Sequence, residues 1–292
     1  MAAANNIVDG RQYYDAAGVY LLPNDASEHD RLDGQSQSLV ALMGGKPFHA
    51  PVSNPKKILD VGCGTGAMTY LLARMYPNAQ VIGVDFSAVP DGRYTKMENI
   101  EYVQADIFEL MKDRNDPRFE AGSFDYVFER LLFMGMTNWP KYLSDISGLL
   151  RPGGWLEVQE ASVNCIKADG TLLSETWFHY PLWRADANAV GLDPEVGPKL
   201  TGLFKQVGGL SEIHETVYRF PPVSRPDKPE LDGLGDKILP MLSGVLRRTS
   251  SPRRSAEEMA KMEEDLRSMF AAGFEDGDGY SFNVVIGQKT SS

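Results

Sequence analysis

The chain has 292 residues, of which 42% are hydrophobic, and this suffices for one α/β domain with additional helices. Its formal net charge of −11 argues against a general nucleic-acid binder, whose contact surface is basic. Two cysteines, Cys63 and Cys165, are too few for a disulfide framework or a zinc cluster, and the sequence predicts no metal site.

Targeting and membrane-spanning segments are not expected. Residues 1–10 lack the basic and apolar regions of a signal peptide, and no stretch is apolar over the length of a membrane span. We therefore expect a soluble cytoplasmic protein, with the nucleus as the alternative location and no membrane partner.

Residues 1–55 are predicted to form a helical cap outside the sheet. Asp25 or Ser27 suits the N-cap of a helix, and Glu28 supplies an acidic first turn. The helix is expected to end at Met43, before two glycines, and the three prolines that follow indicate a linker.

A glycine-rich turn follows the cap. A short apolar strand is predicted at 57–61, then glycine occupies 62, 64 and 66, and an uninterrupted helical pattern runs from 67 to 75. A strand, a glycine turn and a helix in this order are typical of the start of a nucleotide-binding βαβ unit, in which the glycines let a ligand approach the backbone closely. The turn also fits the looser dinucleotide pattern, so a nicotinamide oxidoreductase is an alternative.

Three acidic residues distinguish between these ligands. Asp60, Asp85 and Asp106 lie at or near the ends of successive predicted strands, at the edge where open α/β sheets bind ligands. So much negative charge would repel a pyrophosphate. It would suit a cofactor that carries a sulfonium, an ammonium, a ribose and an adenine amine.

The remaining elements alternate in the same way. Strands are predicted at 80–85, 100–105, 124–129 and 154–160, as the continuous apolar runs typical of parallel strands. Further helices are predicted at 138–150, 171–191, 196–207, 231–247 and 255–272, and further strands at 213–220 and 280–287.

These motifs carry a family resemblance. Those at 59–66, 84–85, 105–106, 124–127 and 150–154 are similar to the ordered motifs of class I S-adenosylmethionine-dependent methyltransferases. Those at 20–35, 155–160 and 196–200 resemble the fungal LaeA-like, or TAM-domain, methyltransferases. In one departure, Ser36 follows Gln35 where that family usually has histidine, so no role of that histidine is carried over.

The resemblance implies an α/β fold with a Rossmann-like seven-stranded methyltransferase sheet, helices on both faces, and a last strand antiparallel between strands five and six. It implies S-adenosyl-L-methionine as cofactor and S-adenosyl-L-homocysteine as product. It also implies a methyltransferase domain at 56–292 behind the N-terminal cap of 1–55. Helical additions at 171–209 and 231–272 are then expected to line the acceptor side.

Cofactor contacts are assigned to residues at the strand ends. Asp85 is expected to accept hydrogen bonds from both ribose hydroxyls. Asp106 is expected to accept a hydrogen bond from the adenine amine, with Ile107 beside the adenine ring. Asp60 is expected to orient the turn or to face the methionyl ammonium through water. The whole expected set is Tyr20, Asp60, Gly62, Cys63, Gly64, Gly66, Asp85, Phe86, Asp106, Ile107, Glu129 and Arg130.

Catalysis of methyl transfer requires a nucleophile held in line with the S–CH3 bond and exclusion of water. A hydroxyl, a phenol or an acidic carbon also requires a base, for which the candidates are His29, His49, His179, His214 and Glu160. We favour His179, because it lies in an aromatic helix after strand five. Trp177, Tyr180 and Trp183 of that helix are expected in the acceptor pocket or in the core.

The leading functional hypothesis is methyl transfer to an oxygen, nitrogen or carbon atom of a small molecule in fungal secondary metabolism. One alternative is a LaeA-like regulator that binds the cofactor and acts through protein partners. Another is a methyltransferase fold that catalyses a reaction other than methylation.

Overall fold

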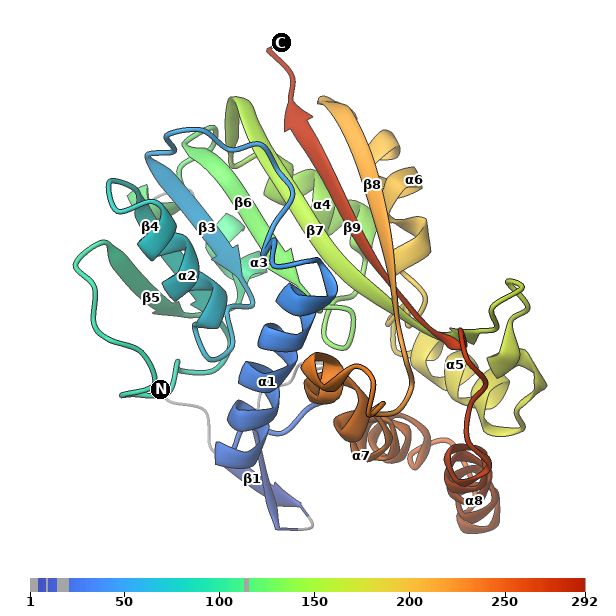
Figure 1. Ribbon diagram of the computed structural model, residues 1–292. Helices are drawn as coiled ribbons and strands as arrows, with labels where there is room; N and C mark the ends of the chain where they lie inside the picture. Colours follow the sequence, from blue (N-terminus) through green and yellow to red (C-terminus); the bar gives the residue numbers. More distant parts are fainter. Residues whose placement is uncertain (1–4, 9, 15–20, 113–115, 292) are drawn as a thin grey trace.

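A seven-stranded mixed sheet forms the centre of the computed structural model, which describes residues 5–8, 10–14, 21–112 and 116–291 (Figure 1). In spatial order the strands are β5 (Ile100–Gln104), β4 (Gln80–Asp85), β3 (Lys57–Val61), β6 (Phe124–Arg130), β7 (Leu150–Ile166), β9 (Gly279–Lys289) and β8 (Leu210–Phe220). Strands β5 to β7 are parallel, and β9 is antiparallel to both of its neighbours. The predicted fold class and the position of the last strand are therefore confirmed.

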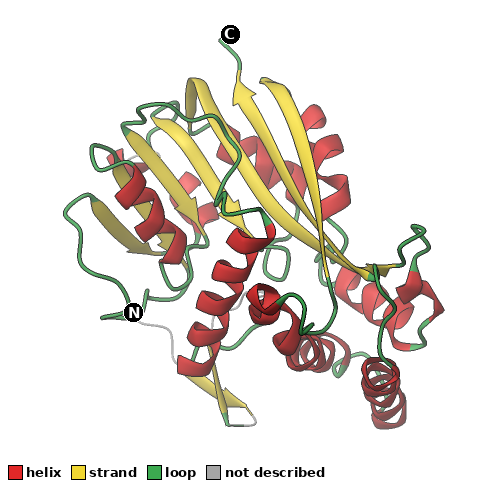
Figure 2. Cartoon of the chain, viewed as in Figure 1, coloured by secondary structure: helices red, strands yellow, loops and turns green. Residues whose placement is uncertain are grey.

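Helices cover both faces of this sheet (Figure 2). Helix α2 lies on one face and α4 and α6 on the other, while α1 and α7 lie beside the ends of the parallel strands (Figure 1). The α-helices are α1 (Ala26–Leu42), α2 (Ala67–Met75), α3 (Ile107–Lys112), α4 (Trp139–Ser147), α5 (His179–Ala189), α6 (Leu200–Val207), α7 (Asp232–Ser250) and α8 (Ala256–Ala272). A separate hairpin consists of β1 (Asn5–Val8) and β2 (Arg11–Tyr14). No helix in the described part of the chain combines the length and apolar character needed to cross a membrane.

Two predicted elements differ most from the structure in their bounds. The helix predicted at 171–191 is only α5, preceded by a short 3-10 turn at Leu173–Thr176. Pro181 has no N–H and fits only in a first turn, so the helix begins at His179. Strand β7 is longer than predicted because its second half pairs with β9 as far as Ile166.

Successive residues of the central strands pack on opposite faces of the sheet. Ile58 and Leu59 are both 0% exposed and belong to separate apolar clusters, one on each side of the sheet. In β6, Tyr126 and Val127 divide in the same way. This double burial explains the continuous apolar runs in the sequence.

Helices α1 and α7 cross above the strand ends, and we call this pair the roof. Helix α1 begins as predicted, because the Asp25 carboxylate accepts a hydrogen bond from the Glu28 N–H at 3.0 Å. The two helices meet at Gly34 and Gly233, where a Cβ on Gly233 would lie 2.3 Å from the Gly34 carbonyl oxygen. The predicted cap thus contacts an element of the predicted methyltransferase domain, and the division at residue 55 stays a prediction.

Substitution of Gly233 by Ala is expected to destabilise the protein by roughly 1–3 kcal/mol, because the added methyl group must push the roof helices apart. The thermal midpoint should fall by about 2–4 °C per kcal/mol. The matched control is Gly244→Ala in the same helix, where a Cβ meets nothing within 4 Å and helix propensity improves. Equal melting of the two variants would contradict the close crossing.

Candidate functional site

Two adjacent cavities lie at the carboxyl ends of the parallel strands. The larger one opens between the glycine turn and the roof, and the smaller one lies beside β4 and β5. Gly62, Asp85 and Leu132 line both cavities. The larger cavity is also lined by Asp60, Cys63, Gly64 and Arg130, and the smaller by Phe86 and Ile107. Most of the predicted cofactor set is therefore brought together.

The glycine turn is packed too closely for side chains. Gly62 and Gly66 have φ values of 65° and 83°, in the left-handed region that favours glycine. A Cβ on Gly62 would lie 2.2 Å from a methyl carbon of Leu132, and one on Gly66 would lie 2.5 Å from the Tyr102 hydroxyl. The Gly62 and Cys63 N–H groups both donate to the Val84 carbonyl, at 2.7 and 3.0 Å.

Asp60 is buried beneath this turn and is 2% exposed. Its carboxylate accepts a hydrogen bond from the Thr69 hydroxyl at 2.6 Å. Burial raises the pKa of Asp60 to about 7, although the Thr69 hydrogen bond and the Arg130 charge act in the opposite direction. A cation that entered the larger cavity would favour the charged form of Asp60.

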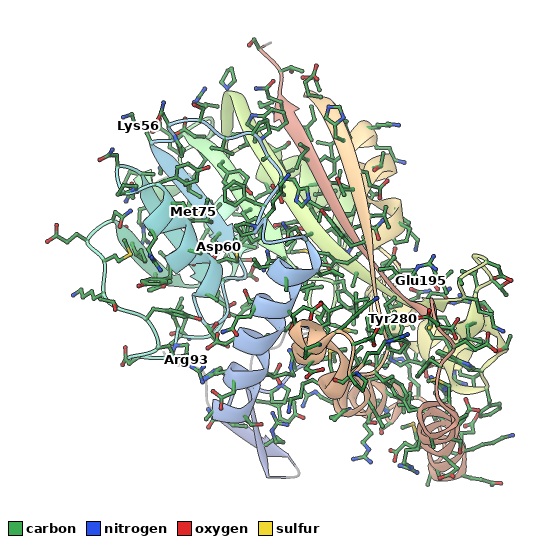
Figure 3. The ribbon with its side chains drawn as sticks, viewed as in Figure 1. Lys56, Asp60, Met75, Arg93, Glu195 and Tyr280 are labelled. Carbon is green, nitrogen blue, oxygen red and sulfur yellow. The ribbon has the colours of Figure 1, made fainter. Side chains whose placement is uncertain are left out.

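Asp85 lies where the two cavities meet. Its neighbour Asp60, at the same end of the sheet, is labelled in Figure 3. The two oxygens of Asp85 accept the backbone N–H groups of Gly64 and Ser87, at 2.9 and 2.8 Å. Burial raises its pKa, whereas both hydrogen bonds lower it. These bonds hold the carboxylate in one orientation between the cavities.

Asp106 is placed differently from its neighbours. Ala105 and Ile107 line the smaller cavity, but Asp106 is not among its lining residues. The Asp106 carboxylate accepts the Phe108 N–H at 2.8 Å and so caps the first turn of α3. Its predicted hydrogen bond to adenine stays a prediction.

Arg130 supplies a buried cation to the wall of the larger cavity. Its guanidinium donates to the Gln159 side-chain oxygen at 2.7 Å and to the Pro47 carbonyl at 2.8 Å. Burial lowers its pKa to about 10, so the group remains charged at neutral pH. These partners are uncharged, which leaves the charge of Arg130 available to a ligand anion.

Glu129 and Glu160 form a second buried pair behind the cavities. Both side chains are 0% exposed, and Glu160 accepts the Leu132 N–H at 2.5 Å. Burial raises the pKa of Glu129 to about 8, and burial together with the neighbouring Glu129 raises the pKa of Glu160 well above its usual range. Glu129 is therefore largely protonated at neutral pH, and Glu160 holds the segment that separates the cavities.

His179 lies outside both cavities. It is 4% exposed, and its Nδ1 lies 2.7 Å from the Asp265 carboxylate of α8, which also accepts its backbone N–H. Burial lowers the pKa of His179. Its role as a base stays a prediction, and its position outside both cavities does not favour that role. His29, His49 and His214 are likewise absent from the residues that line the two cavities.

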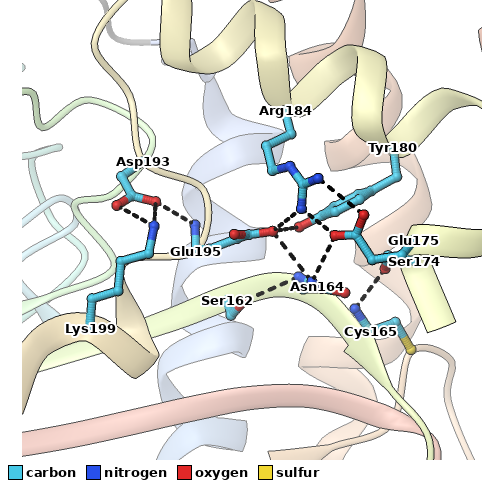
Figure 4. Close-up of polar contacts among 10 residues, drawn as sticks. All are labelled: Ser162, Asn164, Cys165, Ser174, Glu175, Tyr180, Arg184, Asp193, Glu195 and Lys199. Carbon is cyan, nitrogen blue, oxygen red and sulfur yellow. Dashed lines mark hydrogen bonds and ion pairs between the residues drawn. The ribbon is translucent and has the colours of Figure 1, made fainter. Parts of the chain in front are cut away.

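The aromatic residues of α5 and its approach, Trp177, Tyr180 and Trp183, line neither cavity. Figure 4 shows why this helix is fixed: the Tyr180 hydroxyl donates to Glu195 at 2.8 Å, and Arg184 pairs with Glu175 and Glu195. Tyr180 and Trp183 belong to the buried core. The last member of the predicted set, Tyr20, lies outside the described residues.

Sequence reasoning missed a contact between the roof and the turn. The Asp33 carboxylate of α1 accepts hydrogen bonds from the Thr65 hydroxyl at 2.5 Å, from Arg93 at 2.5 Å and from the Tyr94 hydroxyl at 3.0 Å. Arg93 (labelled in Figure 3) and Tyr94 lie in the loop after β4. Asp33 belongs to the motif that carried the family resemblance, which was the available signal, but its partners are distant in sequence.

Known proteins resemble this chain over most of its length. A family model described as a methyltransferase domain matches residues 53–190. The methyltransferase str2 of Strobilurus tenacellus is 30% identical over 232 residues, which covers 78% of this chain and 80% of that protein. The secondary metabolism regulator LAE1 of Cochliobolus heterostrophus is 30% identical over 243 residues, which covers 80% of this chain and 76% of that protein.

The fold is also similar to a solved structure, phosphoethanolamine N-methyltransferase 2 of Haemonchus contortus in complex with S-adenosyl-L-methionine. The TM-score is 0.52 at 21% identity, and the match covers 87% of this chain and 52% of that protein. At this level of identity the likeness concerns the fold.

The raised pKa of Glu129 predicts a pH dependence of stability. Because its pKa rises from 4.5 to about 8 on folding, the contribution of Glu129 to stability is fully present below about pH 4.5 and is lost as the pH rises to about 8. The variant Glu129→Gln should show a shallower decline, by up to about 1.4 kcal/mol per pH unit, in urea unfolding at several pH values. The exposed control Glu98→Gln should keep the slope of the unsubstituted protein. Parallel slopes for all three proteins would contradict the buried acid.

Proposed function

Because the chain belongs to the S-adenosylmethionine-dependent methyltransferase family, we propose that it transfers a methyl group from this cofactor to a small-molecule acceptor, by in-line displacement, in fungal secondary metabolism. One observation carries the proposal. A single carboxylate, Asp85, stands between two cavities, one beside the glycine turn and one lined by apolar residues from the ends of β3 and β4 and from the segments that follow β5 and β6.

The residues at the strand ends match the parts of such a cofactor. The smaller cavity, with Ile107 and Met136, suits the adenine ring, and Asp85 suits the ribose hydroxyls. Asp60 and Arg130 offer opposite charges to a methionyl ammonium and carboxylate. Gly62 has no side chain, so its backbone can pack against Leu132 where both residues line the two cavities. When bound, the cofactor supplies a methyl group on a sulfonium that is already a good leaving group.

The chain's own contribution is then placement and exclusion of water. The roof covers the strand ends, and Asp33 fixes it to Thr65 of the turn. No described residue that lines either cavity is a histidine. A neutral amine or a carboxylate needs only to be placed, so such acceptors suit this site without a dedicated base.

A regulator that binds the cofactor and acts through protein partners is the second candidate. It rests on the equal identity, 30%, to the methyltransferase str2 and to the regulator LAE1. Incubation of the protein and an extract of its source with cofactor labelled in the methyl group separates the two. A labelled small molecule supports the enzyme, and cofactor binding without any transfer of label supports the regulator.

Substitution of Asp85 by Asn tests the cofactor site. The variant loses a charged hydrogen-bond acceptor, so its affinity for S-adenosylhomocysteine in calorimetry should fall roughly ten- to hundredfold. The matched control is Asp145→Asn on α4, whose carboxylate pairs with Lys141 on the surface and should leave the affinity unchanged. Unchanged affinity in the Asp85 variant would refute the placement of the ribose.

A thermal melt distinguishes the cofactor from the dinucleotide alternative. S-adenosylhomocysteine at about 100 times its dissociation constant should stabilise the protein by roughly 2.7 kcal/mol, whereas NADH should not. This corresponds to a rise in midpoint of about 2–4 °C per kcal/mol. A rise with NADH alone would overturn the proposed function.

A further inference from the structure

The part of the larger cavity beneath α7 is apolar. Residues of α7 spaced about one turn apart face residues from the ends of β7, β8 and β9. Examples are Val163, Phe220, Leu234, Ile238, Leu242 and Phe282. These side chains are all apolar, so this part of the cavity favours an apolar ligand.

One polar group interrupts this apolar wall. Tyr280, the second residue of β9, lines the cavity and is 3% exposed, and its hydroxyl has no hydrogen-bond partner among the described residues. Its ring lies 5.8 Å from that of Phe220 (Figure 3 labels Tyr280 beside the roof end of the sheet). Buried polar groups in native proteins are almost always paired, so the unpaired hydroxyl of this cavity-lining residue is a candidate partner for a ligand.

The chemical character of the Tyr280 hydroxyl is that of a donor. Burial raises its pKa well above the usual range, so the phenol keeps its proton at physiological pH. Such a group can donate a hydrogen bond to a ligand oxygen, but it does not act as a base at neutral pH.

The other polar residues near this wall have different positions. Lys237 of α7 is exposed, so its charge lies in water at the cavity mouth. The Ser162 hydroxyl is engaged within β7, where it accepts the Asn164 N–H at 3.2 Å, whereas the Tyr280 hydroxyl has no partner among the described residues. Tyr280 is therefore the group that would orient a ligand in the apolar part of the cavity.

From these contacts we propose that the acceptor is an apolar molecule with a carbonyl-type oxygen, which accepts a hydrogen bond from the Tyr280 hydroxyl beneath α7. This inference rests on the proposed function and names the class of acceptor for the same site. Tyr280 binds and orients the acceptor, while the methyl donor occupies the strand ends.

Two probes of the same shape test the hydrogen bond. 2-Acetylnaphthalene carries a carbonyl oxygen where 2-isopropenylnaphthalene carries a CH2 group, so the pair differs in one hydrogen-bond acceptor. Each is titrated into protein saturated with S-adenosylhomocysteine. The ketone should bind roughly three- to tenfold more tightly than the hydrocarbon. In Tyr280→Phe this preference should disappear, while the affinity for the hydrocarbon stays the same.

Tyr142→Phe is the matched control, because Tyr142 is also fully buried but lines neither cavity. It should keep the preference for the ketone. Leu234→Trp should fill the apolar part and weaken both probes without affecting S-adenosylhomocysteine. If Tyr280→Phe does not fold, the infrared carbonyl stretch of 2-acetylnaphthalene bound to the unsubstituted protein replaces it, and a shift to lower frequency than in hexane is expected.

The outcomes distinguish a failure of the proposed function from a failure of the role of Tyr280. Failure of the unsubstituted protein to bind S-adenosylhomocysteine would overturn the proposed function. Binding of S-adenosylhomocysteine with equal affinity for the two probes, or with binding of neither probe, would overturn the role of Tyr280 alone. So would a ketone preference that survives in Tyr280→Phe, or a carbonyl stretch unchanged from that in hexane.

Discussion

The close packing of the glycine turn against Val84 and Leu132 is the constraint on which the site depends. Two N–H groups of the turn share the Val84 carbonyl, and Gly62 leaves no room for a Cβ. This contact fixes β3 and β4 in register at their ends, so that Asp60 and Asp85 reach the same edge of the sheet. The turn then orients Asp85 directly through the Gly64 N–H. Backbone geometry, rather than side-chain contacts, places the predicted cofactor residues.

Buried carboxyl groups hold the segments around that edge. Glu157, which is 0% exposed, accepts the His49 and Ala50 N–H groups and the Tyr126 hydroxyl, and so fixes the linker that follows α1. Glu160 does the same for Leu132. Each of these acids replaces the water that a loop N–H would otherwise need. Burial of Glu160 disfavours its charged form, so the well-placed loop at Leu132 comes with a raised pKa of that carboxyl group.

The strands, the turn and the acids at the strand ends could be predicted because apolar runs and glycines report local backbone requirements. The antiparallel position of the last strand came from the family resemblance, since no periodicity in one sequence specifies strand order. The position of His179 outside the cavities could not be predicted for a related reason: its partner, Asp265, lies 86 residues away, and helical spacing does not tell which face meets a cavity. The sequence predicted Tyr280 only as a strand residue, because the lack of a hydrogen-bond partner for its hydroxyl can be recognised only in the three-dimensional structure.

The two ends of the larger cavity are built by different parts of the chain. The charged end belongs to β3, β4 and β6, whose geometry is fixed by the glycine turn. The apolar end belongs to α7 and to the ends of β8 and β9; α7 meets α1 at Gly34, and α1 in turn is bound to the turn through Asp33. Substitutions along α7 can therefore alter the shape of the apolar end while the strand ends keep their geometry. In the proposed function, this separation lets acceptor choice vary without disturbing the methyl donor.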